Sequence, residues 1–239
     1  MADFKKRDPE EVRKMFSGVA ARYDKINRAM CFGLDRIWRG ALATAAIRLA
    51  NSPTPKIADF ACGSGDVSLE IAKRSPAAKI TGVDFCAEML SIAEGKIRRA
   101  GFSDRVEFLM RDCLNSGLPA ESFDSLTVSF GFRNFQNRQA GLAEMARVLK
   151  KGGALCILEV SRAGGILESA QSFFMGYVVP AIAGVLGGNK ADYQYLAKTT
   201  SEYPRPAEIE KMLCDAGFGG VRVRKFGCGL VALTTAVKK

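Results

Sequence analysis

The sequence predicts an α/β fold with a doubly wound, mostly parallel sheet of seven strands in the Rossmann-like arrangement. Three observations lead to this prediction. Short apolar runs alternate with amphipathic helical segments between residues 56 and 159. The first apolar run ends in Gly63-Ser64-Gly65, a glycine turn that passes directly into a helical segment. The last two apolar runs have no helix between them, which predicts an antiparallel pair.

The individual elements follow from periodicity and from breakers. Strands are apolar runs bounded by turn residues, and they are expected at 56–61, 79–84, 105–110, 124–129, 154–159, 221–226 and 230–237. Helices carry their apolar residues on one face, and they are expected at 9–21, 37–50, 66–74, 86–100, 137–149 and 206–216. Lys150-Lys151-Gly152-Gly153 predicts a helix stop and a turn before the fifth strand.

The chain is expected to form one domain with four parts. These are an N-terminal helical cap, a cofactor-binding core, a helical insertion, and a C-terminal helix with a strand pair, at 1–50, 51–160, 161–203 and 204–239. The cap either closes the ligand site or forms a plain helical hairpin over the sheet.

The insertion contains the most apolar stretch of the chain, residues 166–186. It is nearly long enough to span a bilayer, but Glu168, Gln171 and Pro180 interrupt it. The insertion is therefore expected to line an apolar substrate pocket or to rest on a membrane, with a buried core helix as the alternative.

Composition restricts the chemistry and the partners. The chain has no histidine, which excludes histidine-based catalytic triads and histidine metal sites. Its seven cysteines form no CxxC pair, so they are expected to be small core residues in a reducing compartment, with no metal site. The charged N-terminal segment is unlike a signal peptide, which predicts a cytoplasmic protein. The net charge of +10 indicates either an anionic partner, nucleic acid or membrane, or a solvated basic surface.

The glycine turn is the candidate cofactor loop. Gly63 and Gly65 allow close approach of a ligand, and Asp84 ends the next strand, where it suits the two hydroxyls of a ribose. A dinucleotide fingerprint would carry a third glycine, and Asp59 and Asp66 would repel its pyrophosphate. The same acids attract the sulfonium and ammonium groups of S-adenosyl-L-methionine. The loop therefore favours that cofactor, and a turn that only packs a helix on a strand is the alternative.

Polar residues follow two further strands at the same edge of the sheet. Asp112 and Cys113 come just after the third strand, where an adenine can meet them, and Ser129 ends the fourth. Arg133 and Asn134 lie a few residues further on. Ligands of open parallel sheets bind outside the carboxyl ends of the strands, so all of these are candidate site residues.

With these motifs the chain resembles the ubiquinone/menaquinone biosynthesis C-methyltransferases, class I S-adenosylmethionine enzymes that methylate a polyprenylated quinol ring. The likeness covers nearly the whole chain. Its motifs are Tyr23-Asp24, Asn27, Trp38, Phe130-Gly131-x-Arg133-Asn134, Arg147-Val148-Leu149-Lys150-x-Gly152-Gly153, Glu159-x-Ser161, Tyr193-x-Tyr195-Leu196-Ala197 and Asp215-Ala216-Gly217-Phe218. The chain departs from the family pattern where methionine, serine, histidine and proline are usual, at Ile26, Cys31, Asp35 and Lys151.

The resemblance implies roles for individual residues. Cofactor contacts are expected at Ser64, Asp84, Asp112, Cys113 and Ser129. Arg133 and Asn134 are expected to act with an ordered water at the reacting ring. Because arginine stays protonated, Arg133 would hold the phenolate charge while water or a carboxylate takes the proton; a structural ion pair is the alternative. Further polar contacts are expected from Tyr23, Asp24, Asn27 and Tyr195.

The resemblance also implies the substrate and its surroundings. The acceptor would be demethylmenaquinol, 2-polyprenyl-6-methoxy-1,4-benzoquinol, or both. Its apolar tail and the basic surface predict peripheral contact with the anionic inner face of the membrane, without a spanning helix. The oligomeric state is left open between a monomer and a homodimer.

Three other functions stay open at this point. The first is methylation of an oxygen or nitrogen on another small lipidic acceptor. The second is an RNA-binding methyltransferase, against which the sequence shows no basic stripe interleaved with aromatics, so no nucleic-acid partner is expected. The third is a cofactor-binding protein that has lost catalysis, against which Arg133 and Asn134 are both present.

Overall fold

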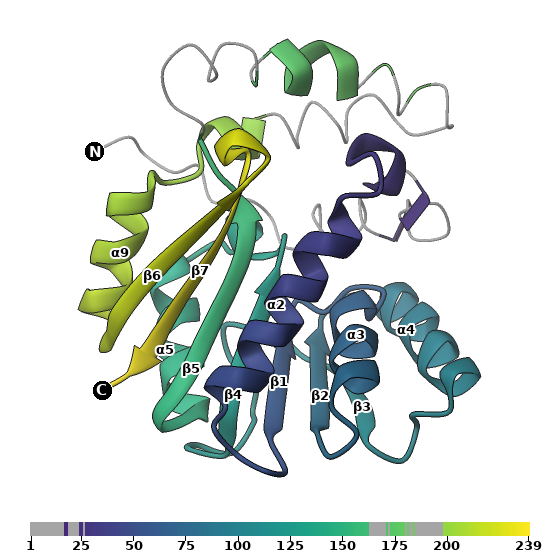
Figure 1. The fold of residues 1–239 in the computed structure, drawn as a ribbon, viewed down its shortest axis with the longest axis vertical. Coiled ribbons are helices and arrows are strands. Elements are labelled where there is room, and N and C mark those ends of the chain that lie inside the picture. The colour runs from purple at the N-terminus through teal and green to yellow at the C-terminus, as the bar shows by residue number, and fades with distance from the viewer. Residues whose placement is uncertain are drawn as a thin grey trace.

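The computed structural model describes residues 17–18, 24–25, 27–162, 171, 173–179, 181, 184 and 198–239. Within them the chain forms a seven-stranded sheet with the strand order β3-β2-β1-β4-β5-β7-β6 (Figure 1). β7 runs antiparallel to β5 and β6, and the other six strands run in one direction. The strands are β1 Lys56–Phe60, β2 Lys79–Asp84, β3 Val106–Met110, β4 Phe123–Ser129, β5 Leu149–Val160, β6 Phe218–Phe226 and β7 Val231–Lys238. The predicted fold class is therefore confirmed.

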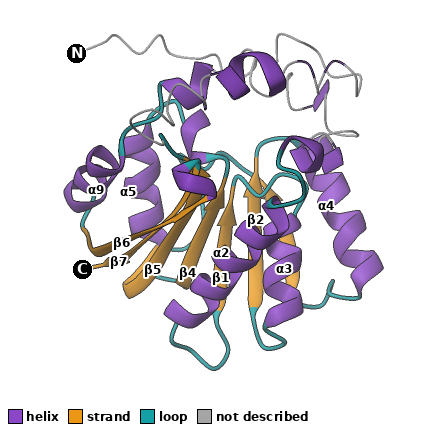
Figure 2. Cartoon of the chain, turned by 45° about the horizontal axis from the view of Figure 1, so that its top comes forward, coloured by secondary structure: helices purple, strands orange, loops and turns teal. Residues whose placement is uncertain are grey.

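Helices cover both faces of this sheet. One face carries α2 (Asp35–Leu49), α3 (Asp66–Arg74) and α4 (Ala87–Ala100), and α2 crosses the sheet obliquely (Figure 1). The other face carries α5 (Arg138–Val148) and α9 (Pro206–Asp215). Figure 2 shows that the arrowheads of β1, β2, β4 and β5 point toward one edge, so any site built from strand ends gathers there.

The two helical layers rest on separate cores because side chains alternate along each strand. On β5, Leu155 and Ile157 pack with α5 and α9, whereas Cys156 and Leu158 pack with α2 and α3. All four side chains are essentially inaccessible to solvent. Strands buried on both faces must be apolar throughout, which is why the sequence shows continuous apolar runs instead of alternation.

The observed elements agree with the predicted ones to within about three residues, apart from β5. The predicted turn at 150–153 is wrong: β5 already begins at Leu149, next to Phe123 of β4, and the register slips before Ala154 meets Ser125. Gly152, with φ +75°, allows this irregularity inside the strand. The predicted helix at 9–21 lies almost wholly outside the described residues.

Two other sequence-based expectations have mixed outcomes. Cys86, Cys113 and Cys156 are buried as predicted, Cys31 and Cys62 are half-buried, and Cys214 is exposed, contrary to the prediction. Of the predicted insertion, the structure describes a short π-helix, Phe174–Val178, and a few flanking residues. Among the described residues, no helix is both long enough and apolar enough to cross a bilayer.

A buried carboxylate attaches the long connection after β3 to α5. Glu144 of α5 accepts hydrogen bonds from the backbone N–H of Ser116 (2.9 Å) and from its hydroxyl. Arg147 donates to the same carboxylate (2.7 and 2.8 Å) and to the carbonyl of Leu118 (2.7 Å). The hydrogen bonds from Arg147 are the main reason why the pKa of Glu144 falls to about 2. This contact holds the connection that begins with Asp112 and Cys113.

The substitution Glu144→Gln tests this attachment. A carboxyl whose folded-state pKa is lowered contributes stability above its unfolded pKa and loses it as the pH falls. We therefore expect E144Q to lose about 1–3 kcal/mol of unfolding free energy at neutral pH, with the difference from wild type shrinking between about pH 5 and about pH 2. Urea unfolding at several pH values measures this.

Asp215→Asn is the matched control, because Asp215 pairs with Lys211 on an exposed surface and should change stability by less than about 0.5 kcal/mol. A pH-independent difference between wild type and E144Q would contradict the proposed attachment.

Candidate active site

The loop after β1 is shaped by residues with positive φ. Ala61 has φ +51°, Gly63 +52° and Gly65 +77°. A Cβ on Gly65 would lie 2.8 Å from the Cβ of Ala93 in α4, so no side chain fits there. The glycine therefore lets the loop turn into α3 directly beside α4. This confirms the predicted strand, glycine turn and helix at residues 56–74.

Asp84, at the end of β2, fastens this loop to the neighbouring strand. Its Oδ2 accepts the backbone N–H of Gly63 (2.8 Å), and its Oδ1 accepts that of Cys86 (2.9 Å). The carboxylate is nearly inaccessible, and burial raises its pKa although the backbone N–H groups oppose the shift. Each oxygen keeps a further lone pair for a hydroxyl donor.

Asp59, in the middle of the loop's strand, faces protein groups. Its two oxygens accept the hydroxyls of Ser68 (2.7 Å) and Thr127 (2.8 Å), and it is 1% exposed. Burial raises the pKa of this carboxyl to about 6, against the effect of those hydroxyls. The geometry fits an indirect role, in which Asp59 holds Ser68 in the first turn of α3. Direct contact between Asp59 and the cofactor stays a prediction.

Ser64 belongs to a network of charged groups that spans four segments. Its hydroxyl donates to Asp24 (2.7 Å) and accepts from Lys96 of α4 (3.0 Å). Lys96 forms ion pairs with Asp24 (2.6 Å) and with Asp66, and Asp66 also meets Arg39 of α2 (3.1 Å). Burial opposes the ionisation of Asp24, but the hydrogen bonds from Lys96 and Ser64 outweigh it, so its pKa is lowered.

The remaining predicted cofactor residues lie at the same edge of the sheet but differ in exposure and in hydrogen bonding. Asp112 is exposed, and its carboxylate accepts the N–H of Leu114 (2.8 Å). The thiol of Cys113 is buried beneath the loop, where it accepts the N–H of Ala61 (3.2 Å). Ser129 ends β4, and its buried hydroxyl has no hydrogen-bond partner among the described residues. An unpaired buried hydroxyl is the kind of group that a ligand satisfies.

These residues fit S-adenosyl-L-methionine. Asp84 offers lone pairs for ribose hydroxyls, Asp112 an exposed carboxylate for an adenine amino group, and Ser129 an unpaired hydroxyl. No cation other than Lys96 and Arg39 takes part in the network of the loop in the described part of the chain, and both are neutralised by aspartates. A pyrophosphate would therefore find no free positive side chain in this network.

We call the edge of the sheet that carries Asp84, Asp112 and Ser129 the cofactor rim. A cavity of about 280 Å³ lies next to it. It begins at Phe130, the residue after Ser129, and extends between the N-terminal end of α2 and the first residues of β7. Its walls are mainly apolar: Met30, Leu34, Trp38, Phe130, Val160, Phe174, Val179, Leu230 and Val231. The rings of Trp38 and Phe130 are 6.4 Å apart. We call this space the ring cavity.

The ring cavity contains a few charged and polar groups, among them Arg133. Its guanidinium donates to Glu159 of β5 (2.7 Å) and to the carbonyl of Phe130 (2.6 Å), and its backbone N–H donates to the same glutamate (3.1 Å). Both members of this pair are buried. Arg133 is therefore both a structural ion pair and a lining residue, so the two interpretations of the sequence are compatible.

Two other predicted catalytic residues, Asn134 and Asp24, are not among the described lining residues of this cavity. Asn134 is half-buried beside Arg133, and Asp24 lies over the cofactor loop. Tyr23 lies outside the described residues. Asn27, which the family motif includes, does line the cavity.

Sequence analysis did not assign a role to Asp35, which the structure places in the ring cavity. Its Oδ2 accepts from Arg39 one turn later, while its Oδ1 is buried with no hydrogen-bond partner among the described residues. Cys31, one turn earlier, lines the same cavity, and burial followed by the charge of Asp35 raises the pKa of its thiol to about 11. The sequence held two signals: the spacing of Asp35 and Arg39, which places both on one helix face, and the position of Asp35 where the family usually has a histidine.

The fold and the rim define a class I S-adenosylmethionine-dependent methyltransferase. Residues 3–238 match the model of the ubiE/COQ5 methyltransferase family, and the chain belongs to this family of C-methyltransferases. The cofactor is accordingly S-adenosyl-L-methionine.

Curated relatives align along most of their length. The chain is 37% identical over 212 residues to a demethylmenaquinone methyltransferase of Porphyromonas gingivalis, covering 87% of this chain and 85% of the relative. It is 35% identical over 231 residues to a ubiquinone/menaquinone biosynthesis C-methyltransferase of Geotalea daltonii, covering 96% and 97%.

Solved structures share the fold at low sequence identity. A putative S-adenosylmethionine-dependent methyltransferase from Methanococcus maripaludis superposes with a TM-score of 0.67 at 18% identity, covering all of this chain and 97% of the other. One from Aquifex aeolicus gives 0.64 at 19% identity, covering 90% and 98%.

Gly65→Ala tests the close packing of the cofactor loop. The added methyl meets Ala93 and φ is positive, so we expect a loss of about 2–4 kcal/mol of stability and at least tenfold weaker cofactor binding. Thermal unfolding and calorimetric titration with S-adenosylmethionine measure both effects.

Gly101→Ala is the control, since Gly101 has nearly the same φ (+75°) with open space around it. This variant should lose about 1 kcal/mol of unfolding free energy and keep its cofactor affinity. Equal effects of the two substitutions on cofactor affinity would contradict the packing role of Gly65.

Proposed function

We propose that the protein transfers a methyl group from S-adenosylmethionine to a ring carbon of a polyprenylated quinol in menaquinone or ubiquinone biosynthesis. The single observation that carries the proposal is the ring cavity, an apolar space that starts one residue after the cofactor rim and is lined by Arg133, one member of a buried ion pair. The printed names of the curated relatives, which align with most of the chain, support the same substrate class.

The size and the walls of the ring cavity suit the ring of the quinol but not its tail. A volume of about 280 Å³ is near the lower end of the ~300–1,000 Å³ common for ligand pockets. Phe32, Leu34 and Leu230 line the cavity and are also exposed, 74% in the case of Phe32. We call these three residues the mouth, and we infer that the prenyl tail leaves over them.

The mouth also supports peripheral membrane contact. Phe173 and Tyr177 are exposed as well, and the neighbouring Phe174 contacts the ring of Phe32 at 6.4 Å. Together these aromatic side chains form an apolar surface of the kind that enters the interfacial region of a bilayer. We propose that this surface rests on the inner face of the cytoplasmic membrane, where the quinol resides.

The chemistry requires a group that accepts a proton. When bound, S-adenosylmethionine supplies a methyl group on a positively charged sulfur, and a quinol ring carbon becomes a strong nucleophile once the adjacent hydroxyl loses its proton. Cys31 keeps its own proton at neutral pH because its pKa is raised. Asp35 lines the cavity, and one of its carboxylate oxygens is buried without a partner among the described residues.

We assign the proton acceptor role to Asp35 and the phenolate-stabilising role to Arg133. Arg133 stays charged, and Glu159 holds its guanidinium in place, so it can stabilise a developing negative charge without moving. Asn134 would act from beside Arg133, as the family resemblance implies.

The experiment that tests the proposed function is radiolabelled methyl transfer. Reduced demethylmenaquinone and a reduced methoxy-polyprenyl-benzoquinone are offered separately to the enzyme with labelled S-adenosylmethionine. Label in either quinol is the expected result. Label only in simple phenols, amines or RNA would overturn the substrate class while keeping the cofactor.

Asp35→Asn tests the proton acceptor. We expect kcat to fall by about 10²–10⁴, with the KM for the quinol within about threefold and cofactor binding unchanged, because an amide fills the space but accepts no proton. Steady-state kinetics with a short-chain quinol and calorimetry measure these values.

Glu70→Gln is the control, since it removes the carboxylate partner of Arg74 outside both the ring cavity and the cofactor loop. It should keep kcat within about threefold. A kcat loss of the same size in both variants would mean that Asp35 does not act as the proton acceptor.

A further inference from the structure

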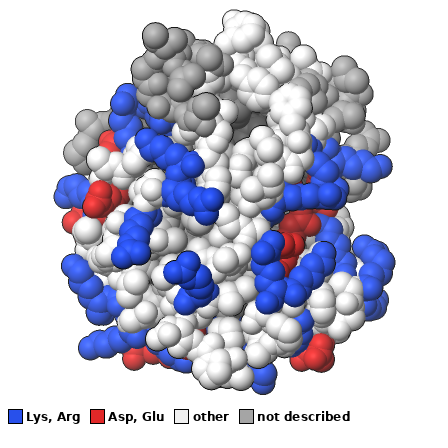
Figure 3. Space-filling view, in the orientation of Figure 1, with Lys and Arg blue, Asp and Glu red and all other residues white. Residues whose placement is uncertain are grey.

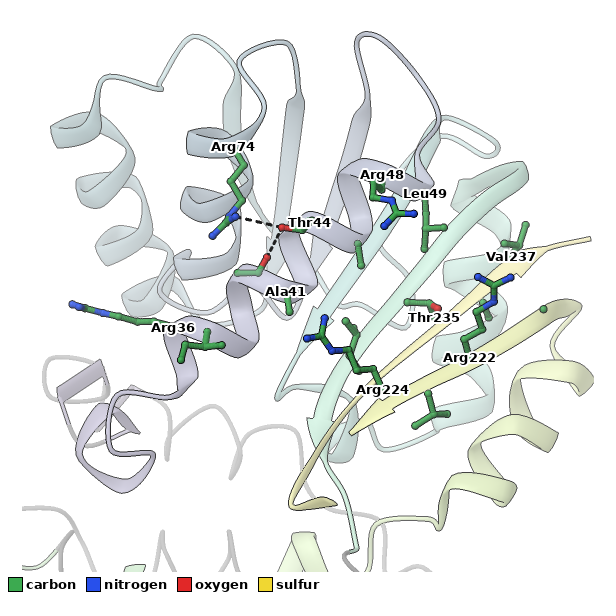
Figure 4. A pocket seen from close by; sticks show the side chains of 17 residues that line it. Arg36, Ala41, Thr44, Arg48, Leu49, Arg74, Arg222, Arg224, Thr235 and Val237 are labelled. Atoms are coloured by element: carbon green, nitrogen blue, oxygen red, sulfur yellow. Dashed lines mark hydrogen bonds between the residues drawn. The ribbon is translucent and has the colours of Figure 1, made fainter. Parts of the chain in front are cut away.

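A second, larger hollow lies on the face of the sheet where α2 crosses it. It has a volume of about 820 Å³ and runs between α2, the end of α3 and the strands β6 and β7. Its charged lining residues are all arginines: Arg36, Arg48, Arg74, Arg222 and Arg224 (Figure 4). We call it the arginine groove. None of the residues that the family motif or the ring cavity uses for chemistry lines it.

The positive charge of the arginine groove is largely uncompensated. Arg74 forms an ion pair with Glu70 (2.7 Å), and no ion pair occurs at the other four arginines among the described residues. All five side chains are exposed. In the space-filling view, basic side chains stand around a white hollow on this face (Figure 3). Arg48, Arg222 and Arg224 lie by the gap between α2 and the strands β6 and β7, whereas Arg36 points away from it and Arg74 lies on the α3 side of α2 (Figure 4). A group of guanidinium side chains of this kind attracts an anion and repels a cation.

The floor of the arginine groove is apolar. Ala41 and Ala45 of α2 lie beside Leu233 of β7, and the exposed side chains of Ile37, Leu49 and Val237 continue this floor to its ends. It stays open because α2 packs mainly on β4 and β5 and makes only a few contacts with β7. A guanidinium rim above an apolar floor matches a molecule with a phosphate head and an apolar body.

We propose that the arginine groove binds an anionic phospholipid of the bilayer, with the phosphate at the arginines and the glycerol and upper acyl chain on the apolar floor. The proposal rests on the proposed function, which places the substrate in the membrane. Arg36 and Ile37 of the groove lie on the same first turns of α2 as Leu34 of the mouth. Lipid in the groove would therefore hold the mouth against the membrane surface.

Two other occupants fit the observations less well. A symmetric homodimer through this face would place the same arginines against each other, and like charges in one interface are unfavourable. Single-stranded RNA would need aromatic side chains on which bases stack, and the groove has no aromatic lining residue in the described part of the chain. An anionic lipid needs neither a neutralising partner nor a stacking platform.

The test is flotation of the full-length enzyme with vesicles of phosphatidylcholine alone and of phosphatidylcholine with phosphatidylglycerol in equal parts. The groove variant is Arg222→Gln/Arg224→Gln. The matched control is Arg98→Gln/Arg99→Gln, an equal loss of charge on the exposed face of α4 outside the groove. We expect the groove variant to lose about fivefold in vesicle affinity per arginine, roughly 25-fold together, and the control less than about threefold.

Each outcome has a defined meaning. Selective loss in the groove variant, with methylation of a short-chain quinol in solution unchanged, supports the proposal. Equal binding of all three proteins, or equal losses in both variants, overturns it. Displacement of the enzyme from vesicles by millimolar inorganic phosphate would indicate a free-phosphate site instead.

Further readouts separate the remaining occupants and the proposed function. Analytical ultracentrifugation tests for a dimer. If the wild type and the control are dimers and the groove variant is a monomer, the groove binds a second copy of the chain and the lipid proposal is overturned. If the wild type and the control bind RNA at physiological salt and the groove variant does not, the groove binds nucleic acid and the lipid proposal is overturned. No methylation of any quinol by the wild type refutes the proposed function, while vesicle flotation still reports on the groove.

Discussion

The active edge depends on one carboxylate, that of Asp84. It accepts a backbone N–H from the loop after β1 and another from the segment after β2, so two neighbouring strand ends share one anchor. Both hydrogen bonds hold a loop whose glycines would otherwise leave it many conformations. The same carboxylate keeps lone pairs, so the group that orders the loop is also the one predicted to meet the ribose.

The cofactor rim and the ring cavity adjoin because the chain turns sharply at the end of β4. Phe130 has φ +54°, and Gly131 follows where a Cβ would lie 2.6 Å from that of Ala61. Ser129 therefore ends β4 with a buried hydroxyl that has no partner among the described residues, while Phe130 and Arg133 line the cavity. Strained residues of this kind persist where the surroundings hold them, here through the ion pair of Arg133 and Glu159. This geometry would place a ring carbon close to the methyl donor.

Local features of the chain were predictable from the sequence, and long-range ion pairs were not. Apolar runs and glycine turns located the strands, the helices and the loop at Gly63 and Gly65, because burial and positive φ leave local signatures. The partners of Arg133 and Ser64 were missed, since Glu159 and Lys96 are separated from them by many residues and meet them only in the fold. The unpaired oxygen of Asp35 is likewise a property of its surroundings.

The most direct measurement is the position of the transferred methyl group in the product. The enzyme is given a reduced quinol and S-adenosylmethionine carrying carbon-13 in the methyl group, and the product is examined by carbon NMR. A label bonded to a ring carbon is the result expected if Asp35 and Arg133 activate the ring from beside the cofactor rim. A label found as a methoxy carbon would contradict that arrangement, because it would mean that the hydroxyl oxygen, not the ring, faces the methyl donor.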